Sequence, residues 1–275
     1  MNPRQLYDAG RLNDAIAVLS QELRSHPLDA ARRGFLAELL CFAGLWERAD
    51  TQLDTLGHQD PEAMVGVSLF RQLVRAAQAR EQFFAEGRLP EFLDPPTSPA
   101  IRLYLEASIH LREGRSARAG DLLGEAENQR QRLSGTCNGR PFDDFRDLDD
   151  LTACVFEVLT STGKYYWIPF ERVERIEFRA PVRSRDLLWR QVHMMVSDGP
   201  EGDVFLPVTY PMAGEADETL LLGRATDWRG GDGAPVRGVG QRTCLVGDEA
   251  LGILEMEKLE ILTAADDPAA PGSDG

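Results

Sequence analysis

Small and apolar residues recur at a fixed distance along the first half of the chain. Ala15 and Leu19 stand four positions apart and therefore lie on one face of a helix; Ala49 and Leu53 repeat this pair. The small residue lets a paired helix approach closely, and the leucine fills the core between the two helices. The pattern predicts a series of helical hairpins. The recurring positions, each pair 34 residues apart, are Ala9-Gly10 and Ala43-Gly44, Ala15 and Ala49, Leu19 and Leu53, and Pro27 and Pro61.

The glycines and prolines of this pattern occupy positions where a hairpin needs them. Gly10 and Gly44 suit the tight turn between two helices, where a Cβ would be strained. Pro27 and Pro61 suit the start of the next helix, because proline has a helical φ and no backbone donor to lose. A 34-residue period is that of tetratricopeptide repeats (TPR). We therefore expect a TPR-like array of α-α hairpins in residues 1–133.

A further hairpin follows at twice this distance. Gly114, Ala119 and Leu123 come 70 residues after the corresponding positions of the second hairpin, which is roughly two periods. The intervening residues have a helical pattern at 64–79 and then helix breakers, the first of them Gly87. We interpret this stretch as a degenerate repeat. The alternative is a set of unrelated amphipathic helices in which the small residues coincide by chance.

Arrays of such hairpins leave a curved surface that usually accepts a peptide or a partner helix. In TPR geometry the first helix of each hairpin lines this groove. For each residue that the register places there, the alternative is an ordinary core or solvated position. The candidate groove residues are Glu38 and Phe42 in the second hairpin, and Tyr104, Ser108 and Arg112 in the third.

The pattern changes after the helical half. Residues 134–141 are rich in turn formers and residues 143–150 form an acidic run. We interpret 134–150 as a solvated acidic linker, since the alternative, a Mg²⁺ or Ca²⁺ site, lacks EF-hand spacing. Short strand-like runs then alternate with Gly, Pro and Asp, which predicts a small barrel or sandwich. The expected strands are 152–160, 164–168, 173–178, 191–196, 203–208, 219–224, 242–246 and 252–262, the last of which also tolerates a helix.

Charge and composition indicate which partners the protein can bind and in which compartment it is found. The formal net charge is −15 and the pI is about 4.8, so the chain would repel a phosphate backbone and nucleic acid is not an expected partner. No apolar run has the length of a membrane span, and no secretory signal is visible at Met1. We therefore expect a cytoplasmic protein without membrane insertion. The cysteines are widely separated and are expected to be reduced, buried thiols: Cys41, Cys137, Cys154 and Cys244.

Motifs of common catalytic sites are missing from the sequence. There is no G-x-S-x-G nucleophile elbow and no G-x-x-x-x-G-K-[ST] phosphate loop. Gly238-Val239-Gly240 is a bare G-x-G without its third glycine. The histidines lie too far apart for a metal site. We predict no catalytic residue, metal or cofactor, and a non-enzymatic protein.

Aromatic and charged residues gather in short phrases of the second half. Tryptophans usually anchor a small core, although some seed an interface. Asp186 and Asp227 each precede a tryptophan, and we interpret them as loop caps. An alternative hypothesis is that the β-rich half binds a small molecule or catalyses a reaction. It is based on a group of residues in glycine-rich surroundings: Arg224, Asp227, Trp228 and Arg242. The candidate residues of the second half are Trp167, Asp186, Trp189, Arg224, Asp227 and Trp228.

Five phrases of the second half resemble, in order, motifs of the ImpE family, also called TagJ. The resemblance reaches to about Leu262 and implies an α+β protein of TPR-like hairpins followed by a mostly-β pseudo-barrel, at 151–262. The low-complexity tail at 263–275 fits no motif, and we expect it to be disordered. The phrases are Tyr166-Trp167-Ile168-Pro169-Phe170, Asp186-Leu187-Leu188-Trp189, Phe205-Leu206-Pro207-Val208-Thr209-Tyr210, Leu222-Gly223-Arg224-Ala225-Thr226-Asp227-Trp228 and Gly238-Val239-Gly240-Gln241-Arg242-Thr243.

The resemblance also implies a role. Members of this family are accessory proteins of bacterial type VI secretion systems. They are associated with an N-terminal helix of the small sheath subunit (TssB, also called VipA) and with the disassembly ATPase ClpV. No catalytic residue comes with the resemblance. The alternative is a general TPR adaptor or regulator with a partner outside secretion.

Overall fold

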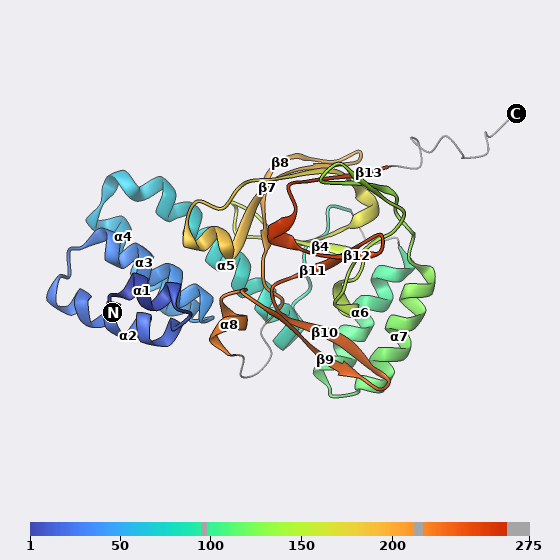
Figure 1. Ribbon diagram of the computed structural model, residues 1–275, viewed down its shortest axis with the longest axis horizontal. Helices are drawn as coiled ribbons and strands as arrows, with labels where there is room; N and C mark the ends of the chain where they lie inside the picture. Colours follow the sequence, from blue (N-terminus) through green and yellow to red (C-terminus); the bar gives the residue numbers. More distant parts are fainter. Residues whose placement is uncertain (95–97, 212–216, 263–275) are drawn as a thin grey trace, which may run out of the picture.

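The computed structural model describes residues 1–94, 98–211 and 217–262. Helices occupy the first half of the chain and antiparallel strands the second, which confirms the predicted α+β architecture (Figure 1). The tail expected at 263–275 lies outside the described residues. Within the described ranges, no helix has the length and apolar character that crossing a membrane requires.

The helical hairpins follow the predicted repeat. In the three turns, Gly10, Gly44 and Gly114 have φ values of 80°, 69° and 73°, a left-handed conformation that strains any residue with a Cβ. The repeated alanines and leucines are buried between the helices, as the spacing predicts. The hairpins are α1 (Pro3–Asp8) with α2 (Leu12–Ser25), α3 (Ala30–Phe42) with α4 (Trp46–Gln59), and α6 (Pro99–Arg112) with α7 (Ser116–Gln129).

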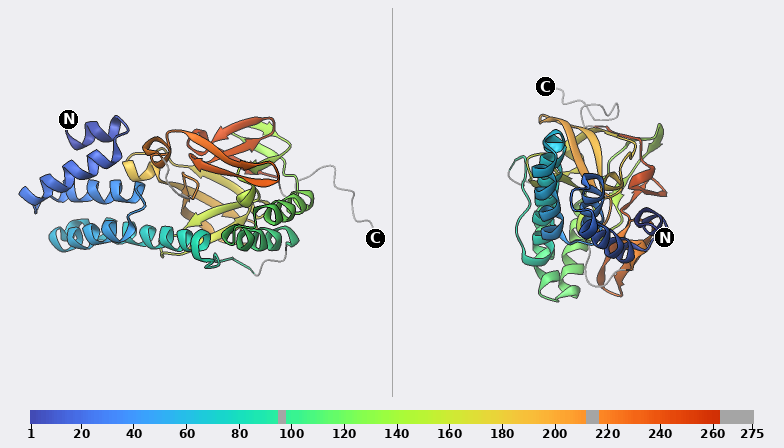
Figure 2. Two further views of the ribbon diagram at one scale, coloured as in Figure 1. Left: turned by 90° about the horizontal axis from the view of Figure 1, so that it is seen from below. Right: turned by 90° about the vertical axis from the view of Figure 1, so that its left-hand side faces the viewer.

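The stretch interpreted as a degenerate repeat is one long helix and not a hairpin. After a short 3₁₀ turn, α5 (Met64–Glu86) runs for 23 residues and ends at Gly87, whose φ of 86° terminates it. It extends from the first two hairpins to the underside of the sheets (Figure 2). The segment after it covers the edge of a strand: the Glu91 N–H donates to the Tyr165 carbonyl at 2.8 Å, and Trp167 N–H donates back to the Glu91 carbonyl.

The strands form two sheets and a separate hairpin. The larger sheet has the order β2-β1-β13-β6-β7-β8-β4-β5, the smaller one β12-β11-β3, and β9 pairs with β10. All paired strands are antiparallel. The strands are β1 (Gly135–Cys137), β2 (Arg140–Phe142), β3 (Phe145–Asp147), β4 (Val155–Leu159), β5 (Tyr165–Pro169), β6 (Val173–Phe178), β7 (Trp189–Val196), β8 (Glu201–Pro207), β9 (Thr226–Gly231), β10 (Ala234–Gly240), β11 (Thr243–Val246), β12 (Glu249–Gly252) and β13 (Lys258–Ile261).

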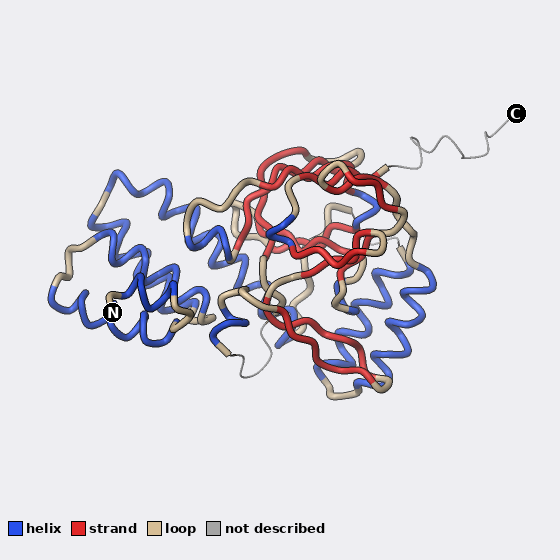
Figure 3. The backbone as a smooth tube through the Cα atoms, in the orientation of Figure 1, coloured by secondary structure: helices blue, strands red, loops and turns tan. Residues whose placement is uncertain are grey.

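The larger and smaller sheets curve around a common apolar interior, and the ring of strands is visible in Figure 3. Phe170 lies 4.3 Å from Phe156 and 4.9 Å from Phe145 between ring centroids, so the interior is filled by packed side chains. We call this interior, with the cluster of buried residues that fills it, the barrel core.

A second apolar core joins the helices to the outer face of the larger sheet. β4 is buried along its whole length because its two faces serve different cores. Phe156 and Val158 point into the barrel core, whereas Val155 and Leu159 belong to the cluster that contains the helices. The helical and β-rich parts of the chain are therefore packed into one body.

Residues 134–150 are not the predicted solvated linker. They contain β1, β2 and β3, and the side chains of Asp147 and Asp149 are fully buried. The reason is that arginines from distant positions in the sequence neutralise the carboxylates: Arg242 pairs with Asp147, and Arg237 of β10 with Asp149. Helix α7 ends at Gln129 and β1 begins at Gly135, so only a short connection separates the two parts.

The expected strand at 219–224 is also wrong. The Asp217 side chain accepts hydrogen bonds from the backbone of Thr219 and Leu220 and starts a helical turn, α8 (Glu218–Leu221). Conversely, the glycine-rich residues 230–233, which lie outside the expected strands, belong to the β9–β10 hairpin. Its turn residues Asp232 and Gly233 both have positive φ values, 51° and 90°, as a two-residue hairpin turn requires.

Candidate functional site

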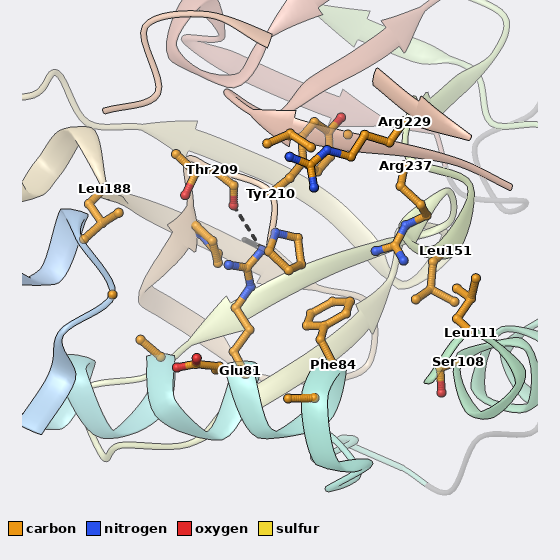
Figure 4. Close-up of a pocket in the computed structure, with 18 of the residues that line it drawn as sticks. Glu81, Phe84, Ser108, Leu111, Leu151, Leu188, Thr209, Tyr210, Arg229 and Arg237 are labelled. Atoms are coloured by element: carbon orange, nitrogen blue, oxygen red, sulfur yellow. Dashed lines mark hydrogen bonds between the residues drawn. The ribbon is translucent and has the colours of Figure 1, made fainter. Parts of the chain in front are cut away.

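A cavity of about 550 Å³ lies where the helices meet the β-rich part. Its walls come from the start of α4, from α5 and α6, from the chain around β7 and β8, and from the β9–β10 hairpin. Glu81 and Phe84 of α5 face Tyr210 and Arg229 across it (Figure 4). We call this space the interface cavity.

Aromatic rings form much of the wall. Trp46, at the start of α4, stacks on Trp189, at the start of β7, with centroids 6.1 Å apart and planes inclined by 23°. Phe70 of α5 contacts Trp189 edge-on at 5.9 Å and holds it from the other side. Rings of this kind offer a large rigid surface for an apolar partner, and they are enriched at protein–protein hot spots.

The cavity is open to solvent between α5 and β9. Of its lining residues, Glu81 and Ala85 on α5 and Arg229 on β9 are exposed and mark the mouth. The side chain of Glu81 accepts a hydrogen bond from the indole N–H of Trp46, so this carboxylate is already engaged at the rim. Pocket walls that are apolar with a few placed polar groups are typical of binding sites.

A buried network of charges lies behind the cavity wall. Arg80 of α5 binds Glu157 of β4 through two hydrogen bonds of 2.9 and 2.7 Å, and Arg242 bridges Glu157 and Asp147. Tyr210, which lines the cavity, donates to Asp147 at 2.7 Å, and Tyr165 donates to Glu157 at 2.5 Å. The network connects the helices to both sheets.

The two carboxyl groups of this network respond differently to burial. Burial raises the pKa of Asp147 to about 6, although Arg242 opposes this shift. Burial would raise the pKa of Glu157 too, but Arg80 and Arg242 outweigh it and lower the pKa to about 2. Glu157 has two guanidinium partners, whereas Asp147 has one and a second carboxylate nearby. Glu157 is therefore firmly ionised at neutral pH.

Arg112, which also lines the cavity, has neutral hydrogen-bond acceptors and no carboxylate partner among the described residues. Its Nη1 donates to the Phe83 carbonyl and to the Ser108 hydroxyl, both at 3.1 Å. Partial burial lowers the pKa of this guanidinium. Because α6 ends at Arg112, the side chain lies at the corner where α6, α5 and the cavity meet.

Comparison with known proteins gives this architecture a family. The tetratricopeptide repeat family matches residues 6–66 and the ImpE protein family matches residues 139–260. The type VI secretion system accessory component TagJ of Pseudomonas aeruginosa is 30% identical over 261 residues, which cover 94% of this chain and 91% of that protein. The chain belongs to the ImpE family.

The fold of this ImpE family member has also been seen in a crystal. The crystal structure of a protein from Vibrio parahaemolyticus superimposes with a TM-score of 0.89 at 28% identity, and the match covers 95% of this chain and 97% of that one. The relationship to TagJ supports a type VI secretion accessory protein, and the TPR-like hairpins support a role in protein interactions.

The five predicted groove residues of this ImpE family member do not share an open groove. Phe42 and Tyr104 are buried in the helical core, with 0% and 1% of their surface exposed. Glu38 is half-buried close to Arg185 and Ser184, and this burial raises its pKa. Only Ser108 and Arg112 line the interface cavity. The reasons differ: Phe42 packs against Tyr7 of α1, whereas the β-rich part packs against α3 near Glu38 and against α6 near Tyr104.

The predicted residues of the second half serve several separate purposes. Trp189 lines the cavity, whereas Trp167 is fully buried and donates its indole N–H to Tyr165 at 2.5 Å. Asp186 accepts from the backbone N–H groups of residues 182 and 183, as the interpretation as a loop cap requires. Asp227 accepts from the backbone of the next residue.

The four residues considered as a small-molecule or catalytic site of the β-rich half do not form one site, because each contacts a different part of the molecule. Arg224 donates to the carbonyls of Tyr7 and Asp8 in α1, while Arg242 is buried in the charged network. Trp228 packs on Tyr210 at 5.8 Å and remains 39% exposed. The barrel core is packed with apolar side chains, and the interface cavity offers a space for a ligand.

Several residues of the cavity and its network escaped the sequence analysis: Trp46, Arg80, Phe84, Glu157 and Tyr210. One signal was available. Glu157 stands in the middle of an otherwise apolar strand, Val-Phe-Glu-Val-Leu, and a charge in a strand buried on both faces demands a buried partner.

Proposed function

We propose that this ImpE family member is a non-catalytic adaptor of a type VI secretion system that receives an amphipathic helix of the small sheath subunit, TssB or VipA, in the interface cavity. The observation that carries the proposal is the solvent-open cavity walled by the stacked Trp46 and Trp189, next to a barrel core packed with apolar side chains. An amphipathic helix inserts apolar side chains of one face into such a groove.

The size and setting of the cavity support this occupant. Its volume of about 550 Å³ is within the range of roughly 300–1,000 Å³ that is usual for ligand sites. The long helix α5 forms one side of the mouth, so that a partner helix would pack beside it. Such an adaptor acts in the cytoplasm, where the sheath is assembled. A further link to the ATPase ClpV rests on the family resemblance, and we assign no surface to it.

Calorimetric titration with a synthetic peptide of the sheath subunit's N-terminal helix tests the proposal. We expect Ala85→Trp, which places a large ring at the mouth, to abolish binding without disturbing the fold, because Ala85 is an exposed helix residue. Ala17→Trp, at an exposed position of α2 away from the cavity, serves as the matched control and should bind like the wild type. If the wild-type protein binds no such peptide, the proposal is wrong.

A second candidate is a small molecule bound at the same place. The observation that favours it is that arginines converge on an apolar cavity of suitable volume. Native mass spectrometry of the protein purified from its source would detect a retained ligand, and displacement of that ligand by the sheath peptide would show that both use one site.

A further inference from the structure

The four arginines that line the interface cavity differ in how their charges are matched. Arg80 is bound to the buried carboxylate of Glu157, and Arg237 to that of Asp149, at 2.8 Å from both carboxylate oxygens. Among the described residues, the acceptors of Arg112 are instead neutral: a backbone carbonyl and a serine hydroxyl. Arg112 therefore carries a charge that no carboxylate of the described chain balances.

The side chain of Arg112 is held in a defined position. Both of its hydrogen bonds to described residues are donated by Nη1, and no described acceptor bonds Nε or Nη2. A Cβ placed on Gly87 would lie 2.8 Å from Nη2 and 3.2 Å from Nε, so the guanidinium rests against the glycine backbone. The Nε–Nη2 edge is a fork that matches the two oxygens of a carboxylate. It is pre-organised for such a ligand.

The charges around the cavity favour an anion. Among the described lining residues, Glu81 accepts a hydrogen bond from the indole N–H of Trp46. The buried carboxylates of Glu157 and Asp149 pair with Arg80 and Arg237. Arg112, by contrast, has only neutral acceptors within the part of the chain that the structure describes. Partial burial also removes hydration from Arg112, as the lowered pKa of this group shows, and an incoming carboxylate would replace the lost interactions.

We infer that the partner helix carries an Asp or Glu side chain among its apolar anchor residues and that Arg112 binds this carboxylate side-on at the corner of α5 and α6. The inference rests on the proposed function and adds to it the chemistry that selects the partner. Apolar anchors fill the aromatic part of the cavity, and the single acidic residue sets the register of the helix against α5.

The experiment combines variants of the protein with variants of the peptide. The probe is the N-terminal helix peptide of the sheath subunit, used as the natural sequence and with each Asp or Glu replaced singly by its amide. Arg112→Met keeps an unbranched apolar stem and removes the guanidinium with its charge. Arg102→Met is the matched control, because Arg102 is an exposed residue of the same helix that lies outside the cavity.

We expect Arg112→Met to weaken binding by about 10- to 100-fold, the usual effect of losing hydrogen bonds to a charged group. One amide peptide should lose a similar factor with the wild-type protein and nothing further with Arg112→Met, which identifies the pair by a double-mutant cycle. Arg102→Met should bind like the wild type. The peptide arm keeps the protein unaltered, so a folding defect of a variant does not decide the result.

Two outcomes would overturn the inference, and they are distinguishable from each other. If Arg112→Met and every amide peptide bind with undiminished affinity while Ala85→Trp abolishes binding, the cavity receives a helix without a carboxylate anchor. The proposed function then stands and the inference is wrong. If the wild-type protein does not bind the natural peptide at all, both are wrong.

Discussion

The barrel core and the interface between helices and sheets are neighbours that differ in chemistry. The buried residues that form the barrel core are apolar and closely packed. The interface holds apolar residues too, but it also contains the ion pairs of Arg80 and Arg242 with Glu157 and an open cavity. The barrel core holds the sheets together, whereas the interface keeps the space and the charges that recognition needs.

One strand shows how close these two environments are. On β4, Phe156 and Val158 face the barrel core, while Glu157 between them faces α5 and carries two arginine partners. Buried ion pairs contribute little net stability compared with apolar packing, but they become very costly when one partner is removed. The interface is therefore sensitive to charge, and the barrel core to volume.

The largest expected effect is the loss of charge balance at the interface. Glu157→Ala leaves Arg80 and Arg242 buried without their shared carboxylate, and we expect the free energy of unfolding to fall by about 3–5 kcal/mol. Urea denaturation followed by circular dichroism measures this change. A loss below about 1 kcal/mol would mean that the network tolerates an unpaired charge and that the contrast with the barrel core is weaker than we describe.

The same network predicts a dependence on pH. The pKa of Glu157 is lowered from 4.5 to about 2 in the folded state, so its stabilising effect is present above pH 4.5 and is lost as the pH falls toward 2. The pKa of Asp147 is raised from 3.8 to about 6, so its stabilising effect is fully present below pH 3.8 and is lost as the pH rises through about 6.

Urea denaturation across pH 2–7 separates the two contributions. In Glu157→Gln the loss of stability between pH 4.5 and 2 should be smaller than in the wild type, and in Asp147→Asn the change between pH 4 and 6 should flatten. Glu249→Gln, an exposed glutamate on β12, is the control and should leave the curve unchanged. Parallel curves for the wild type and both network variants would contradict the assignment.

A smaller effect on stability is expected when a side chain is enlarged in the barrel core or beside the interface cavity. Val192→Phe adds volume to the packed barrel core, and we expect a loss of about 1–3 kcal/mol. Ala77→Leu adds volume at a buried residue that lines the cavity, and we expect a smaller loss than for Val192→Phe because one side of this residue borders open space. Thermal unfolding of the two variants gives the comparison. Equal losses would show that the cavity closes in solution.

The smallest expected effect concerns the edge of the interface. Arg224 reaches from the β-rich part to the carbonyls of Tyr7 and Asp8, at 2.8 and 2.9 Å, and its side chain is exposed. We expect Arg224→Ala to lower stability by about 0.5–1.5 kcal/mol and to loosen α1 selectively. Hydrogen exchange should accelerate in α1 and remain unchanged in α4; uniform acceleration would point to a global effect instead.

The amount of this site that could be predicted from the sequence was limited. Ser108 and Arg112, predicted for the groove, and Trp189, predicted for the β-rich half, do line the cavity, but the groove residues do not share an open groove because the β-rich part packs against the helices. The β9–β10 hairpin had a local signal in Asp232-Gly233. No sequence signal indicated that Arg80 and Glu157 form a pair, because the two residues are 77 positions apart.

The sequence by itself determined the features that depend on neighbours along the chain. The left-handed turn at Gly44, the small contact at Ala49 and the strand at Val173–Phe178 follow from backbone freedom and from helical or strand periodicity. Only the tertiary structure decided that the acidic run is buried, since Asp147 depends on an arginine 95 positions away. Local geometry is readable from spacing, whereas the cost of burying a charge depends on which distant side chain comes to meet it.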